Sequence, residues 1–272
     1  MPDGRSVPAV KLSNGNGIET TVIALGATLQ SVIMPDRDGQ KADVALGYDN
    51  LDDYLNQPQY FGSTVGRFAN RLAGGRFKLD GKTWQTPINN GANALHGGTL
   101  GFDKVLWEVT SVKSGRTASV TLRYVSPDGD QGYPGTMTID ATYSLSDNNE
   151  LTIEYVATSD RPTIANITNH AYWNLSGEGS ANGAMGHVVT IPAETYLPTD
   201  SGAIPTGVYR PVAGTVFDFR KPTSVGERVR DLTGGAGAEA VMDFVGEGDA
   251  VAAALGMVRA RGTYFVVGYG GE

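Results

Sequence analysis

The amino-acid sequence predicts a mainly β protein, with a large antiparallel β-sandwich followed by a short C-terminal β–α–β segment. Short runs of alternating or apolar residues recur as far as about residue 225, and turn residues separate them. The tail differs in composition, because 11 of the 37 glycines fall from Gly226 on, whereas lysine and asparagine end at Lys221 and Asn182. Many short strands favour a sandwich over a helical fold, and the change in composition marks a boundary near residues 226–231.

Five segments of the first part are the clearest strands. Their β-branched and aromatic residues alternate with polar ones, and turns such as Asp80-Gly81 bound them. In one of these segments, a period of two places Met137, Ile139, Ala141 and Tyr143 on the same face of a sheet. The expected strands cover residues 20–25, 76–79, 119–124, 137–143 and 151–156.

The tail predicts a different unit. Residues 240–245 form an apolar run typical of a buried strand, and residues 263–267 form a second one. Between them, Asp249 is suited to cap a helix that Gly262 ends. The apolar residues of this expected helix recur at helical spacing and are Val251, Ala254, Leu255 and Val258. We therefore expect a sandwich over residues 1–230 and a β–α–β fragment over residues 231–272.

Charge and composition exclude several classes of function. The formal net charge is −8 and no basic run occurs, so the chain lacks the clustered lysines and arginines that bind nucleic acid. No stretch approaches the ~20 apolar residues that span a bilayer. The start lacks an apolar leader, so we expect a cytoplasmic protein, and a periplasmic one stays open if a leader was removed. The absence of cysteine excludes disulfides and thiolate metal sites.

The three histidines are the first candidates for chemistry. His96 lies in a glycine-flanked loop, and His170 lies among asparagine, tyrosine and tryptophan. Amide groups suit sugar hydroxyls, and aromatic faces suit the C–H groups of a sugar ring. A single histidine is more often structural than catalytic, and only these surroundings raise His96 and His170 above that expectation. His187 precedes an apolar run and fits a structural part of a strand.

Two arginines share the motif Gly66-Arg67-Phe68-Ala69-Asn70-Arg71. We interpret Arg67 as a surface cation, whereas Arg71, beside Asn70, is a candidate donor fork for a polar ligand. Residues 235–240 match the spelling of a dinucleotide-binding fingerprint. That motif needs a strand before it and a helix after it, and here a strand follows, so we interpret the match as chance.

Several short motifs occur together in one order along the chain. They are Leu46-Gly47-Tyr48, Gly66–Arg71, Asn89-Asn90-Gly91, Leu95–Gly98, Thr168–Leu175 and Phe217–Arg220. On these motifs, residues 1–230 resemble the aldose 1-epimerases, or galactose mutarotases. The resemblance implies a galactose mutarotase-like β-sandwich that interconverts the α and β anomers of an aldose of the glucose or galactose class, with no cofactor and no metal.

The resemblance also implies roles for particular residues. His170 is the expected general acid that protonates the ring oxygen as the hemiacetal opens, and His96 is expected to hydrogen-bond around the reacting centre. Asn70 and Arg71 are expected to hold sugar hydroxyls. The family's base is a glutamate on a late strand that nothing in residues 1–272 matches, so we expect impaired turnover. Asp243 is a candidate for a sugar-binding aspartate of the family, and the alternative is that it is simply an acid of the dehydrogenase-like strand in the tail.

The tail departs from the family in a second way. On the segments Leu232–Glu239, Val241–Gly246 and Val258–Gly268, residues 231–270 resemble part of the cofactor domain of medium-chain alcohol dehydrogenases. A gene fusion, a recombination event or a chimera would produce this. The acids considered as a substitute base are Asp243, Glu194 and Glu272. The alternative to an epimerase is a carbohydrate-binding relic or chimera of an epimerase without turnover. A third hypothesis, a nicotinamide-dependent oxidoreductase, is supported by the tail alone. Exposed sheet edges also suggest a homodimer.

Overall fold

A computed structural model describes the chain except for residues 2, 57–58, 181–182, 233–237, 244–257 and 267–272, and it describes no side chains from residue 232 on. The chain forms two compact units. The first unit covers Met1–Tyr172 with Ser201–Ile204, and the second covers Trp173–Asp200 and Pro205–Glu272.

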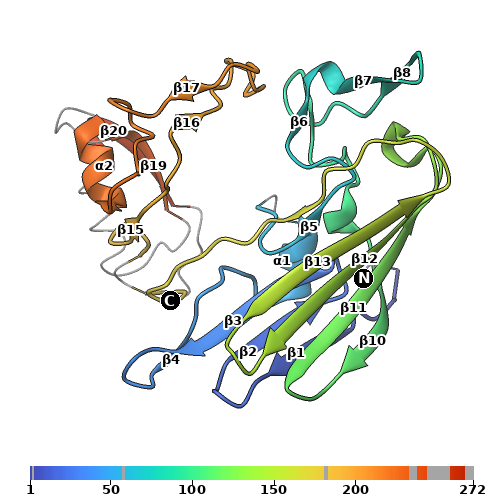
Figure 1. Cartoon of the computed structure of the whole chain (residues 1–272), viewed down its shortest axis with the longest axis horizontal. Helices are drawn as coiled ribbons and strands as arrows, with labels where there is room; N and C mark the ends of the chain where they lie inside the picture. The colour runs from blue at the N-terminus through green and yellow to red at the C-terminus, as the bar shows by residue number, and fades with distance from the viewer. Residues whose placement is uncertain (2, 57–58, 181–182, 233–237, 244–257, 267–272) are drawn as a thin grey trace. The chain divides into compact units, whose positions relative to one another are not determined.

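The first unit contains two four-stranded antiparallel sheets whose strands pair in chain order (Figure 1). One sheet consists of β1 (Ala9–Ser13), β2 (Glu19–Ile23), β3 (Thr28–Pro35) and β4 (Lys41–Asp43). The other consists of β10 (Glu108–Lys113), β11 (Thr117–Ser126), β12 (Met137–Ser146) and β13 (Leu151–Ser159). The antiparallel sandwich that the sequence predicts is confirmed.

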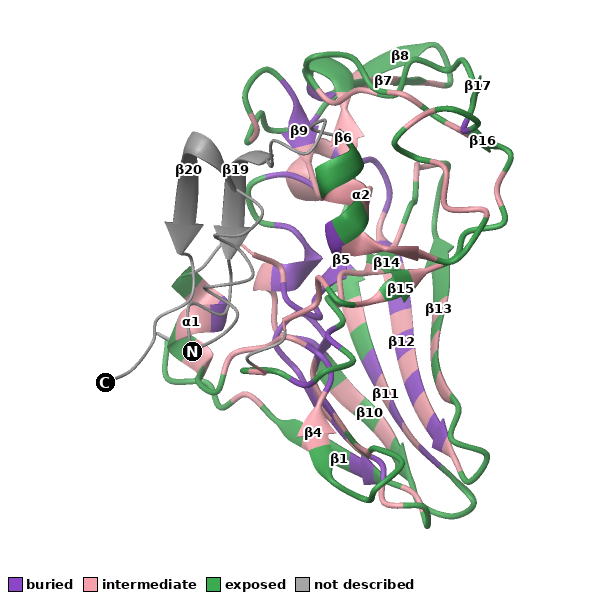
Figure 2. Ribbon diagram, turned by 90° about the vertical axis from the view of Figure 1, so that its left-hand side faces the viewer, coloured by how far each residue is buried: buried purple, intermediate pink, exposed green. Residues whose placement is uncertain are grey.

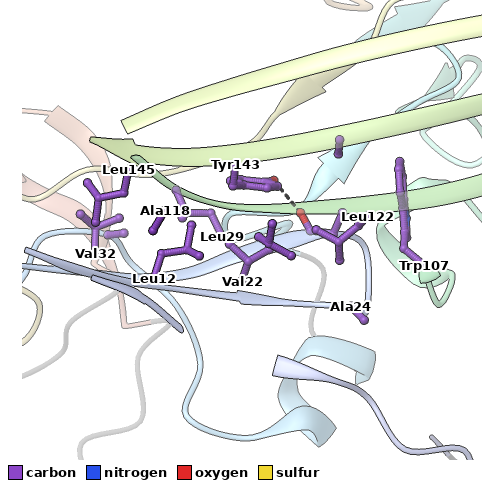
Figure 3. Close-up of a cluster of buried hydrophobic side chains, with 14 of the residues drawn as sticks. Leu12, Val22, Ala24, Leu29, Val32, Trp107, Ala118, Leu122, Tyr143 and Leu145 are labelled. Atoms are coloured by element: carbon purple, nitrogen blue, oxygen red, sulfur yellow. Dashed lines mark hydrogen bonds between the residues drawn. The ribbon is translucent and has the colours of Figure 1, made fainter. Parts of the chain in front are cut away.

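The core lies between these two sheets (Figure 3). On β12 every second residue is buried, beginning with Met137, so the predicted inward face is confirmed, and Figure 2 shows the resulting stripes. The Tyr143 hydroxyl is fully buried and donates a hydrogen bond of 2.6 Å to the carbonyl of Ala27, which ties the two layers together. The residues labelled in Figure 3 are Leu12, Val22, Ala24, Leu29, Val32, Trp107, Ala118, Leu122, Tyr143 and Leu145.

Short elements connect the two sheets and carry the loops of the first unit. The helical ones are α1 (Leu51–Asn56) and the 3₁₀ turns η1 (Ala73–Gly75), η2 (Phe102–Lys104) and η3 (Asp130–Gly132). Three two-stranded antiparallel ladders join β5 (Thr64–Val65) to β14 (Thr168–Asn169), β6 (Arg71–Leu72) to β9 (Ala94–Leu95), and β7 (Arg76–Leu79) to β8 (Lys82–Gln85).

The second unit also contains short ladders. β15 (Val188–Val189) pairs with β18 (Thr223–Ser224), and β16 (Thr195–Tyr196) pairs with β17 (Arg210–Pro211). α2 (Val225–Leu232) follows β18. β19 (Ala238–Asp243) and β20 (Val258–Val266) pair in parallel. In the described part of the chain no helix is long and apolar enough to cross a membrane.

The tail expected as β–α–β differs from the prediction in one respect. β20 begins at Val258, earlier than the strand predicted at 263–267, so Val258 and Gly262 belong to a strand and not to the expected helix. The branched and aromatic residues of this stretch favour extended backbone, which outweighs the helical spacing of Val258. The other residues of the expected helix, with its cap Asp249, lie outside the described residues.

Candidate active site

His170 directly follows β14, and the neighbouring strand fixes its backbone. The His170 amide donates to the Ser63 carbonyl at 2.9 Å, and the Gly62 amide donates to the His170 carbonyl at 3.1 Å. Gly62 leaves no space for a side chain, because a Cβ there would lie 1.9 Å from the Leu29 carbonyl oxygen. The β5–β14 ladder therefore continues into the turn before β5 and holds the histidine on both sides.

His96 directly follows β9 in the same way. Its amide donates to the Asn70 carbonyl at 3.0 Å, which extends the β6–β9 ladder by one pair. His96 and Asn70 both have positive φ, at 51° and 64°. The next residue, Gly97, has φ 93°, and a Cβ on it would lie 1.8 Å from the carbonyl oxygen of Gly66. The backbone of Gly66, directly after β5, therefore leaves room only for glycine at position 97, next to His96.

The two ladders bring the predicted histidines together. The imidazole rings of His96 and His170 lie 5.1 Å apart between centroids and meet edge to face at 88°. A third ring, that of Tyr60, lies 4.8 Å from His96 and 5.6 Å from His170. Apart from the Nδ1 of His96, the imidazole nitrogens form no hydrogen bond to another residue that the structure describes.

The Nδ1 of His96 accepts a hydrogen bond from the backbone amide of Asn70 at 3.1 Å. A backbone N–H only donates, so Nδ1 carries the lone pair and the proton of neutral His96 lies on Nε2. Burial lowers the pKa of His96 to about 4, and positive charge on His170 and Arg71 adds to the effect. Near neutral pH His96 is therefore a hydrogen-bond donor through Nε2.

Asn70 and Arg71 lie beside His96, at the start of β6. The guanidinium of Arg71 donates from Nε to the Oδ1 of Asn90 at 3.0 Å and from Nη1 to the Oδ1 of Asn70 at 3.4 Å. The fork is thereby oriented by two side-chain amides and lies close to the histidine pair. The four residues predicted for the first part of the chain form one cluster.

Arg67, four residues before Arg71, is not the surface cation that we expected. Its side chain is buried in the first unit, where burial lowers its pKa. The guanidinium donates to Ser126 Oγ and to three carbonyls, those of Ser126, Pro127 and Pro134, at 2.8–3.0 Å. These acceptors are far from Arg67 in the sequence, so the motif by itself does not reveal them.

The remaining candidates lie elsewhere. Asp243 ends β19 in the second unit, and its side chain lies outside the described residues, as does Glu272. Glu194 is exposed in the second unit and forms an ion pair of 2.7 Å with Arg220. His187 precedes β15, also in the second unit. Among the described residues, no group of three or more His, Asp or Glu side chains is placed to hold a metal ion.

Two residues of the cluster escaped the sequence prediction. Tyr60 is adjacent to both histidines only through the fold, and no local pattern marks it. Asn90 was noted within Asn89-Asn90-Gly91, but its bond to Arg71 depends on the β6–β9 pairing. Asn90 lies in the turn before β9, the strand that pairs with Arg71, so amide side chains in the turns next to that strand are the signal that finds it.

A family model described as "Aldose 1-epimerase" matches residues 8–255. The galactose mutarotase of Mus musculus is 46% identical over 85% of this chain and 66% of its own length. That of Sus scrofa is 43% identical over the same shares. The aldose 1-epimerase of Escherichia coli K12 is 40% identical over 80% of this chain and 62% of its own length. The chain therefore spans slightly less than two thirds of these relatives.

Solved structures agree in fold. A GalM/aldose epimerase homologue from C. elegans superposes with a TM-score of 0.75 at 35% identity, covering 83% of this chain and 68% of that one. A galactose 1-epimerase from Lactobacillus acidophilus gives 0.73 at 32% identity, covering 82% and 68%. The mainly β fold is galactose mutarotase-like.

Proposed function

The chain belongs to the aldose 1-epimerase family, and we propose that it interconverts the α and β anomers of an aldose of the glucose or galactose class. The observation that carries the proposal is the histidine pair. One imidazole is held as a donor through Nε2, and the nitrogens of the other form no hydrogen bond to any described residue. Two imidazoles so close together, one of them fixed as a donor, suit acid/base chemistry at a single carbon.

The two histidines take different parts in this reaction, and a third group acts as the base. His170, as imidazolium, gives its proton to the ring oxygen while the bond between C1 and that oxygen breaks. A base takes the proton of the C1 hydroxyl, whose electrons form the aldehyde. Rotation about the C1–C2 bond presents the other carbonyl face, and ring closure reverses each transfer, so no atom or electron is gained or lost. His96 donates from Nε2 to an oxygen on C1.

Asn70 and Arg71 orient the sugar beside this pair. A guanidinium offers several donors in a fixed plane, and an amide offers both donors and an acceptor, which together suit adjacent hydroxyls. The partners of Arg71, Asn90 and Asn70, keep that plane in place.

The base is the unassigned part of the proposal. Of the three acids considered, Glu194 is exposed and paired with Arg220, which weighs against it. We propose that residues 1–272 by themselves turn over weakly, since loss of a general base lowers rates ~10²–10⁴-fold. We also propose that residues 231–270 are a dehydrogenase-like segment, which the parallel pairing of β19 with β20 supports, and that Asp243 is a sugar-binding acid.

Polarimetry with fresh α-D-glucose and α-D-galactose tests the proposal. The chain should raise the rate of mutarotation above that of buffer, and His170→Ala should remove the increase. His187→Gln is the matched control, because it changes the third histidine, which lies in the other unit. Sugar binding without any rate increase would contradict the epimerase and support a carbohydrate-binding protein without turnover.

Assembly and location are separate proposals. Within the part of the chain that the structure describes, β13 is an edge strand of its sheet. We propose that two copies pair through this edge, because an unpaired edge offers backbone groups to a second chain. We separately propose that the protein is cytoplasmic. Light scattering that shows a monomer at all concentrations would contradict the dimer.

A further inference from the structure

Tyr60 completes a cluster of three rings with the two histidines. The centroid distances are 4.8 Å to His96, 5.6 Å to His170 and 5.1 Å between the histidines, so each ring contacts the other two. The tyrosine meets His96 edge to face at 62° and His170 at a tilt of 33°. Aromatic contacts of this kind favour particular angles, so each ring restricts the rotation of its neighbours.

The backbone of Tyr60 is held in an unfavourable conformation. Its φ is 59°, which a bulky aromatic residue rarely adopts. The Tyr60 carbonyl accepts a hydrogen bond from the Ser63 amide at 3.1 Å, and Gly62 within the same turn bonds to His170. The turn that places Tyr60 is therefore the turn that holds His170. Such strain persists where the surroundings fix it, and it clusters at functional sites.

The Tyr60 hydroxyl forms no hydrogen bond to any residue that the structure describes. Burial raises the pKa of Tyr60, and the nearby charge of Asp103 raises it further, so the side chain is neutral across the working range of pH. The ring contacts that the structure gives this side chain are those with the two imidazoles.

We infer that Tyr60 is a positioning residue for the histidine pair: its ring keeps the imidazoles of His96 and His170 in their edge-to-face arrangement and keeps water away from His96. The inference rests on the proposed epimerase function, because positioning matters where a proton must pass between a fixed imidazole and a substrate. The charged groups around the pair are Arg71, beside His96, and Asp103, which acts on Tyr60.

Three variants test the inference. Tyr60→Phe keeps the ring, Tyr60→Ala removes it, and Tyr172→Ala removes a tyrosine that contacts His170 at 5.1 Å. NMR titration gives the pKa of His96, with its resonance identified by loss in His96→Gln. Polarimetry gives kcat and KM, and thermal melts show which variants are folded at the assay temperature.

Tyr60→Phe should match wild type in kcat and in the pKa of His96. Tyr60→Ala should raise that pKa by about one unit or more toward its ordinary value of about 6.5, since water reaches the ring. It should lower kcat at least about tenfold while KM changes less than about threefold. Tyr172→Ala should leave the pKa of His96 unchanged.

Two results would overturn the inference. One is an unchanged pKa of His96 in Tyr60→Ala, and the other is a Tyr60→Phe variant as impaired as Tyr60→Ala, which would assign the role to the hydroxyl. If Tyr60→Ala does not fold, Tyr60→Leu replaces it, and an unchanged kcat would then be the contradiction. If wild type shows no mutarotation, the proposed function fails, but the NMR titration still decides the positioning of His96.

Discussion

The sandwich and the candidate site are built in different ways within the same unit. In the sandwich, β11 and β12 pair over ten residues, and alternate side chains enter the core. The site rests on ladders of two residues, extended by single hydrogen bonds to His96 and His170. A long ladder keeps its structure after a substitution because many other hydrogen bonds and side-chain contacts remain. Short ladders place a side chain accurately only while every neighbouring backbone bond is kept.

Arg67 and Arg71 show the same difference inside one six-residue motif. Arg67 is buried and donates hydrogen bonds to four acceptors in residues 126–134, so its role is structural. Arg71 lies beside the histidine pair and is oriented by two amides. Arg67 thus stabilises the sandwich, whereas Arg71 belongs to the site. Substitutions should show stability and activity to depend on different arginines.

The largest effect on stability should come from Arg67→Met. The change leaves buried carbonyls without donors, so the free energy of unfolding should fall by about 3–5 kcal/mol. Arg123→Met is the control, since it breaks an exposed ion pair with Asp140 and should cost about 0–1 kcal/mol. Urea unfolding measures both, and equal losses would contradict the structural assignment of Arg67.

The site should be broken by Gly97→Ala. The new Cβ would clash with the Gly66 carbonyl and push His96 out of place, so the mutarotation rate should fall about 10²-fold. Gly81→Ala is the control, because Gly81 also has positive φ but nothing within 4 Å of its added Cβ. If polarimetry finds the two variants equally active, the packing of Gly97 does not position the histidine.

A smaller effect should follow from Asn90→Ala. Loss of one hydrogen bond to a charged group is worth about 1.5 kcal/mol, so KM should rise about tenfold as the Arg71 fork loses its partner. The value of kcat should change little, because Asn90 does not reach the histidine pair through any hydrogen bond that the structure gives. Asn148→Ala, in an exposed turn, should leave KM unchanged. An unchanged KM in Asn90→Ala would show that Arg71 needs no orientation.

The contribution of His96 to the free energy of unfolding should depend on pH. The pKa of His96 is about 4 in the folded chain and about 6.5 when unfolded, so between these values the unfolded chain binds more protons at this residue. The contribution of His96 therefore rises with pH through this window and is lost as pH falls. The unfolding free energy of wild type, relative to His96→Gln, should increase from about pH 4 to about pH 6.5. A constant difference in urea unfolding would disprove the lowered pKa.

The same contrast explains what the sequence predicts. The alternation from Met137 to Tyr143 is local, so the sandwich follows from it, and β12 is observed as expected. His96, His170, Asn70 and Arg71 stand out through their neighbours in the sequence and do lie together. The roles of Arg67, Tyr60 and Asn90 depend on partners that the fold brings close. The helix predicted to include Val258 was wrong, because this residue lies in a strand whose pairing the local spacing does not show. Long-range contacts have no local pattern to reveal them.

The most direct test of the account is the protonation of His96 itself. Long-range ¹H–¹⁵N NMR on the labelled chain at about pH 7, with the resonance identified by loss in His96→Gln, distinguishes the two tautomers and the imidazolium. The account predicts a proton on Nε2 and a free lone pair on Nδ1, as the amide of Asn70 requires. A proton on Nδ1, or a charged imidazolium at this pH, would contradict the division of roles between the two histidines.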